Sequence, residues 1–189
     1  MSMPVEDGCM AEPGRAHRIL SGESLTIERI EPQDLVLVGA LDGADAGPRL
    51  AATLACAAPA PNRWTETEDH VLASTGAGRW MVSAKAPAAS SLAARLEAAL
   101  GATAAVVDFS HGRVVFALEG QGARVVLAKG CTVDLRPAKL AAGAAIVAAL
   151  TKLAVTILVD EGERFEVYVA SSYADHVEEW LTASTREFA

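Results

Sequence analysis

The sequence predicts an α+β protein, in which a mostly antiparallel sheet has helices packed on one side. Short apolar runs rich in β-branched residues recur along the chain, and polar or glycine-rich corners join several of them in pairs. Segments with the 3.6-residue period of a helix follow these runs. The expected order of elements is therefore β-β-α-β-β-α-β-β-α-β-β-β-α.

Composition limits the class of protein before any element is placed. The net charge of −8 and the pI near 5.0 argue against nucleic acid and anionic membrane as main partners. Apolar residues make up 51% of the 189 residues, which is enough for a buried core. The cysteines at positions 9, 56 and 131 lack metal-ligand spacing and suit a reducing compartment. No apolar signal segment accompanies Glu6 and Asp7, so we expect a cytoplasmic protein.

Residues 1–23 have no hydrophobic period, and we expect a flexible tail there. Residues 24–189 are expected to form a single α+β domain made of two similar halves, about 24–103 and 104–189. The first half is expected to contain strands at Leu25–Ile30, Leu35–Val38, His70–Ala73 and Trp80–Val82, a helix starting near Pro48, and a second helix that carries Leu92, Leu96 and Leu100. The turn Ser74–Gly78 lacks the lysine and the following helix of a phosphate-binding loop, so we interpret it as a hairpin turn.

The second half begins with two apolar runs around a polar corner. Ala105–Phe109 and Val114–Leu118 are short and rich in β-branched residues, and Ser110–Arg113 separates them. This pattern predicts a strand, a hairpin corner and a strand. Asp108 and Arg113 flank the corner, where a salt link or turn hydrogen bonds would explain them without catalysis.

A helix is expected after Gly122, and Lys129-Gly130 is typical of its end. Glycine adopts the left-handed conformation easily, and the lysine would face the negative end of the helix. The segment Cys131–Pro137 follows, and Pro137 restricts the residue before it to an extended conformation. Thiolates are favoured at the N-termini of helices rather than at their C-termini, so we expect Cys131 to be structural.

The run Leu140–Val159 has 20 residues and a single charge, as a membrane-spanning helix would. Placing Lys152 near the bilayer centre would cost about 2.5–3.5 kcal/mol, so we interpret the run as two buried strands. These strands are expected at about Ala144–Leu150 and Leu153–Val159. A returning strand, Phe165–Val169, and a last helix complete the chain; the helix is expected to be capped by Ser172 and to bury Tyr173, Val177, Trp180 and Leu181.

No pattern of catalytic or metal-binding residues stands out in the sequence. The histidines at 17, 70, 111 and 176 have no metal-ligand spacing. Val125 occupies the position where a dinucleotide-binding fingerprint beginning at Gly120 would need its third glycine. The residues that remain as structural or interface candidates are Asp108, Ser110, Arg113, Gly130, Cys131, Asp134 and Arg136.

The stretches VVDFSHGRVVFALEG, GARVVLAKGCTVDLRP and FEVYVASSYADHVEEWL resemble the gamma subunit of heterotetrameric sarcosine oxidase. The resemblance is dense from about Leu100 onward and continues in TGAGRWMVSA at 75–84, and its most specific part is Lys129-Gly130-Cys131 with Asp134-Leu135. Members of this family usually carry histidine where this chain has Arg136.

The resemblance implies a complex that oxidises sarcosine to glycine, transfers the one-carbon unit to tetrahydrofolate and forms peroxide. FAD, FMN, NAD and tetrahydrofolate would then belong to the partners, the alpha, beta and delta subunits, and this chain would bind no cofactor. We expect the Ser110–Arg113 corner and the Cys131–Pro137 segment to form or border the interface with those subunits.

The same residues are similar, more distantly, to the folate-dependent aminomethyltransferase of the glycine cleavage system. That family uses a carboxylate in a strand that follows a glycine pair, whereas Ala148–Val159 contains neither a carboxylate nor a glycine. A structural subunit is therefore the main interpretation. The alternatives are a free-standing domain that binds folate or another small molecule, and an interaction module that no longer belongs to such a complex.

Overall fold

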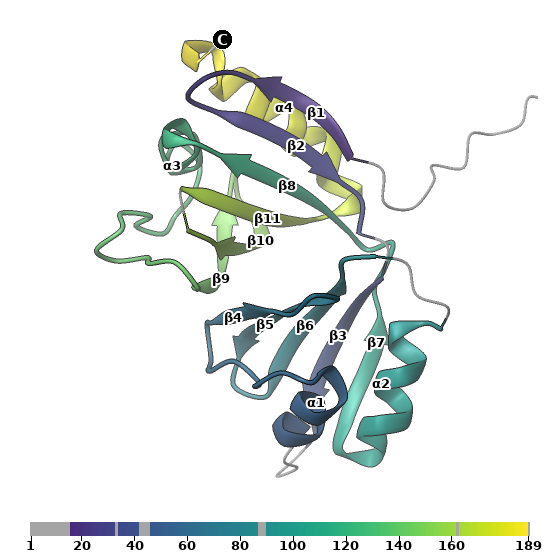
Figure 1. The fold of residues 1–189 in the computed structure, drawn as a ribbon. Helices are drawn as coiled ribbons and strands as arrows, with labels where there is room; N and C mark the ends of the chain where they lie inside the picture. The colour runs from purple at the N-terminus through teal and green to yellow at the C-terminus, as the bar shows by residue number, and fades with distance from the viewer. Residues whose placement is uncertain (1–15, 33, 42–45, 87–89, 162, 189) are drawn as a thin grey trace, which may run out of the picture.

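The computed structural model describes residues 16–32, 34–41, 46–86, 90–161 and 163–188, which form two antiparallel sheets with helices on their outer faces (Figure 1). The larger sheet has the order β1 (Ala16–Ser21), β2 (Thr26–Ile30), β8 (Arg113–Glu119), β11 (Arg164–Ala170), β10 (Leu153–Val159) and β9 (Ala145–Leu150). The smaller sheet has the order β4 (Trp64–Glu66), β5 (His70–Gly76), β6 (Arg79–Ala84), β3 (Leu35–Ala40) and β7 (Ala104–Asp108). The α-helices are α1 (Ala46–Leu54), α2 (Leu92–Leu100), α3 (Gln121–Ala128) and α4 (Ala174–Ser184), and short 3-10 turns lie at Gly101–Thr103, Ser171–Tyr173 and Arg186–Phe188.

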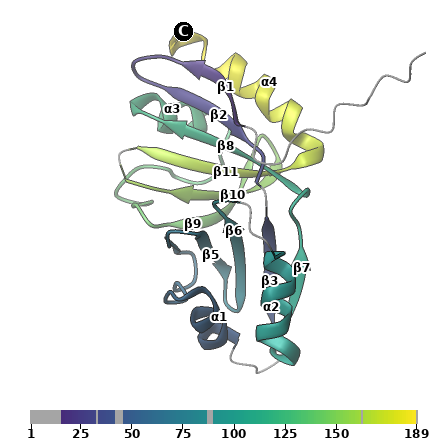
Figure 2. The same ribbon diagram turned by 45° about the vertical axis from the view of Figure 1, so that its right-hand side comes forward.

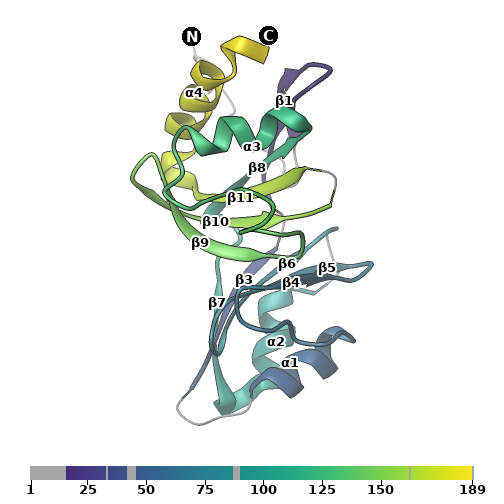
Figure 3. The ribbon, with the colours of Figure 1, turned by 90° about the vertical axis from the view of Figure 1, so that its left-hand side faces the viewer.

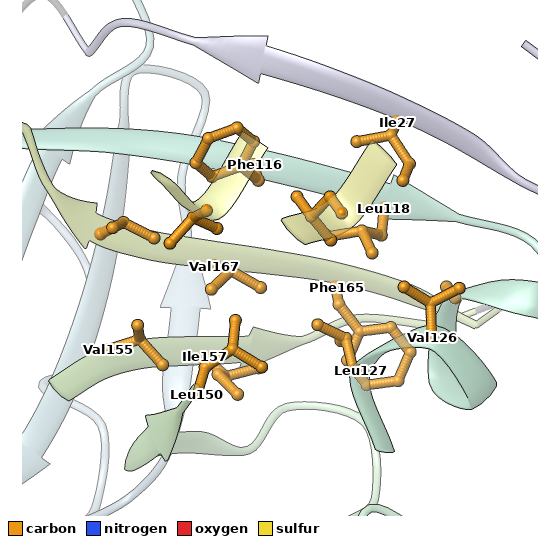
Figure 4. Packing of buried hydrophobic residues seen from close by; sticks show 14 of the residues in the cluster. Ile27, Phe116, Leu118, Val126, Leu127, Leu150, Val155, Ile157, Phe165 and Val167 are labelled. Carbon is orange, nitrogen blue, oxygen red and sulfur yellow. The ribbon is translucent and has the colours of Figure 1, made fainter. Parts of the chain in front are cut away.

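Three hydrophobic cores hold these layers together, and Figure 3 shows their order as helices, sheet, sheet and helices. Side chains alternate along each strand, so that Phe116 and Leu118 of β8 face helices α3 and α4 while Val115 faces the other sheet. Figure 4 shows the first core, where Val126 and Leu127 of α3 lie over the apolar face of the larger sheet. Each sheet therefore carries helices on one side, as predicted, and packs against the second sheet on the other.

Every predicted helix and strand is present, and the sequence pattern missed two edge strands. Strand β1 occupies part of the segment that was expected to be a tail, and it pairs with β2; residues 1–15 lie outside the described ranges. Strand β4 has only three residues and pairs with β5. Both strands are short or polar because an edge strand buries little of its surface, which leaves a weak hydrophobic pattern.

The expected hairpin between residues 105 and 118 is wrong, because its two strands belong to different sheets. Strand β7 pairs with β3 in the smaller sheet, and β8 pairs with β2 and β11 in the larger one. Leu35 at the start of β3 lies beside Phe109 just after β7, where the Phe109 amide donates a 2.8 Å hydrogen bond to the Leu35 carbonyl. Strands β2 and β8 thus lie in one sheet and β3 and β7 in the other, so the sheets do not follow a division of the chain near residue 104.

The apolar run Leu140–Val159 forms a hairpin of β9 and β10, as predicted. Thr151 and Lys152 have φ angles of 51° and 74°, which is the backbone of a type I′ turn. No helix in the described part of the chain has both the length and the apolar character needed to span a membrane.

The start of α4 differs from the prediction. The helix begins at Ala174 after a 3-10 turn, and the residue at its N-cap is Tyr173, which makes no side-chain cap hydrogen bond. Tyr173 is 50% exposed, whereas Val177 and Leu181 are buried in the core. The 3-10 turn has shifted the helix so that its apolar stripe starts one residue after Tyr173.

Candidate functional site

The candidate residues lie in two separate places, which we call the crossover corner (Asp108–Arg113) and the knuckle (Gly130–Pro137). The corner joins β7 to β8, and the knuckle follows α3, the helix that β8 leads into. The corner lies beside Ser171 at the end of β11, and the knuckle begins beside β9, the strand at the edge of the larger sheet (Figures 1 and 2). The structure therefore does not bring them together into one site.

The hydroxyl of Ser110 fastens the crossover corner to the neighbouring linker. Its Oγ donates to Asp108 Oδ1 at 2.6 Å and accepts a hydrogen bond from the buried backbone amide of Leu35 at 3.2 Å. The Ser110 amide also donates to the Asp108 carboxylate, at 3.1 Å. These hydrogen bonds to the ionised form lower the pKa of Asp108.

A second set of contacts fixes the other side of the corner. The Ser171 amide donates to the Gly112 carbonyl at 3.1 Å, and its hydroxyl donates to the His111 carbonyl at 2.9 Å. A Cβ atom on Gly112 would lie 2.4 Å from the Phe109 ring, so only glycine allows the ring to pack there. The corner is therefore held between β3 and the start of α4.

Arg113 stands apart from these contacts. Its guanidinium lies 5.6 Å from the centroid of the Phe109 ring, and it forms no ion pair with any carboxylate in the described residues. The salt link expected between Arg113 and Asp108 is thus not formed. Burial lowers the pKa of Arg113, and no carboxylate of the described residues opposes that effect.

Two clefts meet at the linker that precedes β3, and both are lined by Glu31 and Pro32. The smaller cleft, of about 180 Å³, is lined by Arg29, Ser110, His111, Arg113, Val114 and Ser171 as well. The larger cleft, of about 470 Å³, lies between the two sheets over β5, β6, β8 and β11.

The charges of the larger cleft pair with one another. Lys85 binds Glu66 at 2.6 Å, and Arg164 binds Glu166 at 3.2 Å. The hydroxyl of Tyr168, a residue that is 2% exposed, donates to Glu166 at 3.1 Å. Burial first, and then the neighbouring Glu166, raise the pKa of Tyr168. The sequence argument missed this group, although its members alternate along β11 and therefore share one face.

The knuckle is anchored through its backbone. The Thr132 amide donates to the Ala149 carbonyl at 3.0 Å, and Cys131 forms an isolated bridge with Leu150. Cys131 is partly buried against the first core. Arg124 of α3 donates to the carbonyl of Leu135, whose side chain is buried. The knuckle thus closes the end of the first core.

The charged residues of the knuckle pair within the loop. Arg136 Nη2 lies 2.5 Å from Asp134 Oδ2, and the Arg136 side chain is 77% exposed. Hydrogen bonds from the side chain and backbone of Arg136 lower the pKa of Asp134 to about 2. This cation already has a partner, in contrast to Arg113.

Gly130 and Lys129 do not end α3 in the expected way. Gly130 has no positive φ, and its role is steric, since a Cβ atom there would lie 2.6 Å from the Trp180 ring. Lys129 donates to the Ser184 carbonyl at 2.6 Å and to Glu187 at 2.5 Å, so it binds the end of α4. In the part of the chain that the structure describes, no group of histidine, cysteine or acidic side chains is arranged to hold a metal ion.

Comparison with known proteins gives both a family and a fold. A family model described as "Sarcosine oxidase, gamma subunit family" matches residues 47–187. The sarcosine oxidase subunit gamma of Corynebacterium sp. (strain U-96) is 31% identical over 84 residues, which are 44% of this chain and 41% of that relative. The aligned part thus spans less than half of that relative's length.

Two solved structures share the fold. A chain of the heterotetrameric sarcosine oxidase from Corynebacterium sp. U-96, in complex with pyrrole 2-carboxylate, matches with a TM-score of 0.80 and 24% identity, covering 90% of this chain and 88% of that one. The glycine cleavage system aminomethyltransferase T from Bartonella henselae matches with a TM-score of 0.60 and 20% identity, covering 81% of this chain and 44% of that one. The likeness to the aminomethyltransferase that the sequence predicted is thereby confirmed at the level of the fold.

Proposed function

Because the chain belongs to the sarcosine oxidase gamma subunit family, we propose that it is the gamma subunit of a heterotetrameric sarcosine oxidase-like flavoenzyme and has a structural role. The observation that carries this proposal is the extent of the family match, which includes both the corner and the knuckle. The likeness of fold to a chain of a heterotetrameric sarcosine oxidase supports it.

In this proposal, the partner subunits perform the chemistry. Sarcosine is oxidised at a flavin in a partner, and FAD, FMN, NAD and tetrahydrofolate belong to the alpha, beta and delta subunits. The hairpin of β9 and β10 supports this division, because Ala148–Val159 has no carboxylate where the aminomethyltransferase resemblance would require one for one-carbon transfer. The chain contributes a rigid body, with its corner and knuckle held by hydrogen bonds.

A second candidate function follows from the larger cleft. Its volume of about 470 Å³ falls within the range of small-molecule sites, which is about 300–1,000 Å³. Lys85 and Arg164 line it, and the carboxylates of a ligand such as a folate would compete there with Glu66 and Glu166, which already pair with these cations. Calorimetric titration of the chain with tetrahydrofolate distinguishes the two functions, since a structural subunit releases no binding heat in that experiment.

Co-expression tests the proposed function. We expect the chain to elute with its flavin and folate subunits as a stable complex containing one copy of each, and to be colourless and inactive toward sarcosine by itself. If the chain elutes as a monomer beside its co-expressed neighbours, the subunit assignment fails. If flavin absorbance stays with the isolated chain through gel filtration, or if that chain forms peroxide from sarcosine, the structural role fails instead.

A further inference from the structure

The smaller cleft contains a cation that the described residues leave without an anion. Arg113 and Arg29 both line this cleft, and their surroundings differ. Arg29 binds Asp175 and Glu178, each at 2.9 Å, and these hydrogen bonds raise its pKa although burial opposes them. Arg113 is partly buried, and its guanidinium lies over the face of the Phe109 ring.

A partly buried charge without a counter-charge is unfavourable, because it loses water and gains no ion pair. Glu31 lines the same cleft, yet it forms no ion pair with Arg113. The positions around Arg113 are fixed by the bonds of Ser110 and Ser171 described above, so the guanidinium stands in a preformed hollow. Such a hollow suits an anion from another molecule.

The size of the cleft limits the anion to a small group. Its volume of about 180 Å³ is below the range of about 300–1,000 Å³ that small-molecule sites occupy, and it is enough for one side chain. The hydroxyls of Ser110 and Ser171 border it but already donate to Asp108 and to the His111 carbonyl, so Arg113 is the group that remains to bind a carboxylate there. In the neighbouring larger cleft, Lys85 and Arg164 need no anion from another molecule, because they already pair with glutamates of this chain.

We propose that the smaller cleft receives one acidic side chain, aspartate or glutamate, from another subunit of the complex, and that Arg113 is its ion-pair partner. The inference rests on the proposed function and names a contact that assembly uses. An arginine that matches the planar carboxylate in two hydrogen bonds would fix the orientation of the subunits as well as their affinity.

The test compares variants of the full chain in binding to the co-expressed partner subunits. Arg113→Gln is expected to raise the dissociation constant about 30-fold or more. Arg113→Lys is expected to raise it less, since lysine keeps the charge but cannot donate two parallel hydrogen bonds to one carboxylate. The matched control is Arg18→Gln, because Arg18 already binds Glu28 at 2.7 Å within this chain. Thermal unfolding of the isolated Arg113→Gln chain is expected at a temperature no lower than that of the wild type, because the variant removes a partly buried charge that has no counter-charge in the described residues.

The outcomes separate the inference from the proposed function. If the wild-type chain forms no complex, both fail. If the complex forms and Arg113→Gln binds as tightly as the wild type, the inference fails and the proposed function stands. If Glu31→Gln weakens binding as much as Arg113→Gln does, the partner of Arg113 lies within the chain and the inference is overturned. Binding of acetate or succinate to the isolated chain at Arg113, with assembly insensitive to Arg113→Gln, would assign the cleft to a small ligand instead.

Discussion

The crossover corner and the knuckle each carry an aspartate and an arginine a few residues apart, and they use them differently. In the knuckle, Asp134 and Arg136 bind each other at the surface. In the corner, Asp108 is occupied by Ser110, and Arg113 turns to the Phe109 ring instead. Among the described residues, the same residue types therefore pair with each other in one loop and leave the cation of the other loop without an ion pair.

The difference separates a loop whose charges pair within the described residues from a loop that we propose to meet a partner. The contacts of the knuckle end within the chain, because its backbone joins β9 and its charges cancel. The corner also stabilises the fold through the hydrogen bonds of Ser110, but Arg113 forms no stabilising ion pair within the described residues. A residue whose contacts do not explain it is the better candidate for an interface.

The largest effect that we expect from this comparison is on assembly. Arg113→Glu should weaken the complex with the partner subunits by about 2–5 kcal/mol, because it places two carboxylates together in one cleft. Arg136→Glu should weaken it less, because it disturbs an exposed pair that is screened by water. Dissociation constants measured at low and high salt check this order. Equal losses at both positions would show that the knuckle borders the interface as closely as the corner.

The next effect concerns the hydroxyl that joins the two linkers. Ser110→Ala removes the acceptor of the buried Leu35 amide and should lower the free energy of unfolding by about 1–3 kcal/mol. Thr132→Ala in the knuckle is the matched control, since its hydroxyl lies 3.5 Å from the Ala149 carbonyl and is exposed. Urea denaturation of the isolated chain measures both. Similar losses in the two variants would contradict the bridging role of Ser110.

A comparable or smaller effect is expected for the thiol of the knuckle. Cys131→Ser keeps the size of the side chain and places a hydroxyl against the first core, so we expect a destabilisation of about 0.5–3 kcal/mol. Assembly and turnover of the complex should survive. A loss of turnover beyond about a hundredfold, with the complex intact, would exceed what such a destabilisation explains and would make Cys131 a chemical residue.

The smallest effect is on stability in acid. The folded state lowers the pKa of Asp108, so its stabilisation is complete above the ordinary pKa near 3.8 and is lost as the pH falls through the folded value. Asp108→Asn should therefore differ from the wild type most above about pH 4, by less than about 1 kcal/mol because the residue is exposed. Asp134 has the same sign, and Asp134→Asn serves as the comparison for the knuckle. Chemical denaturation between about pH 2 and 7 follows both. A difference that grows as the pH falls would contradict the assignment.

The local pattern of the sequence determined which segments form helices and strands. Strand and helix periods depend on near neighbours, so the predicted elements are found where they were expected. The hairpin at Ala145–Val159 was also predictable, because a turn of two residues can join only strands that lie side by side. The motifs of the second half pointed to the family as well, since they are continuous in sequence.

Only the tertiary structure decided which strands pair and what the candidate residues contact. Two strands joined by a polar corner can form either a hairpin or a crossover between two sheets. The crossover forms here because β7 pairs with β3 and β8 pairs with β2, and both partners are distant in the sequence. The same holds for Gly130, whose reason for being glycine is the ring of Trp180, fifty residues away. Arg113 was flagged by its place in a motif, but its lack of an ion pair depends on every element that packs around it. Contacts between distant segments depend on how the apolar faces of entire sheets and helices are buried, and the hydrophobic period of a single segment does not contain that information.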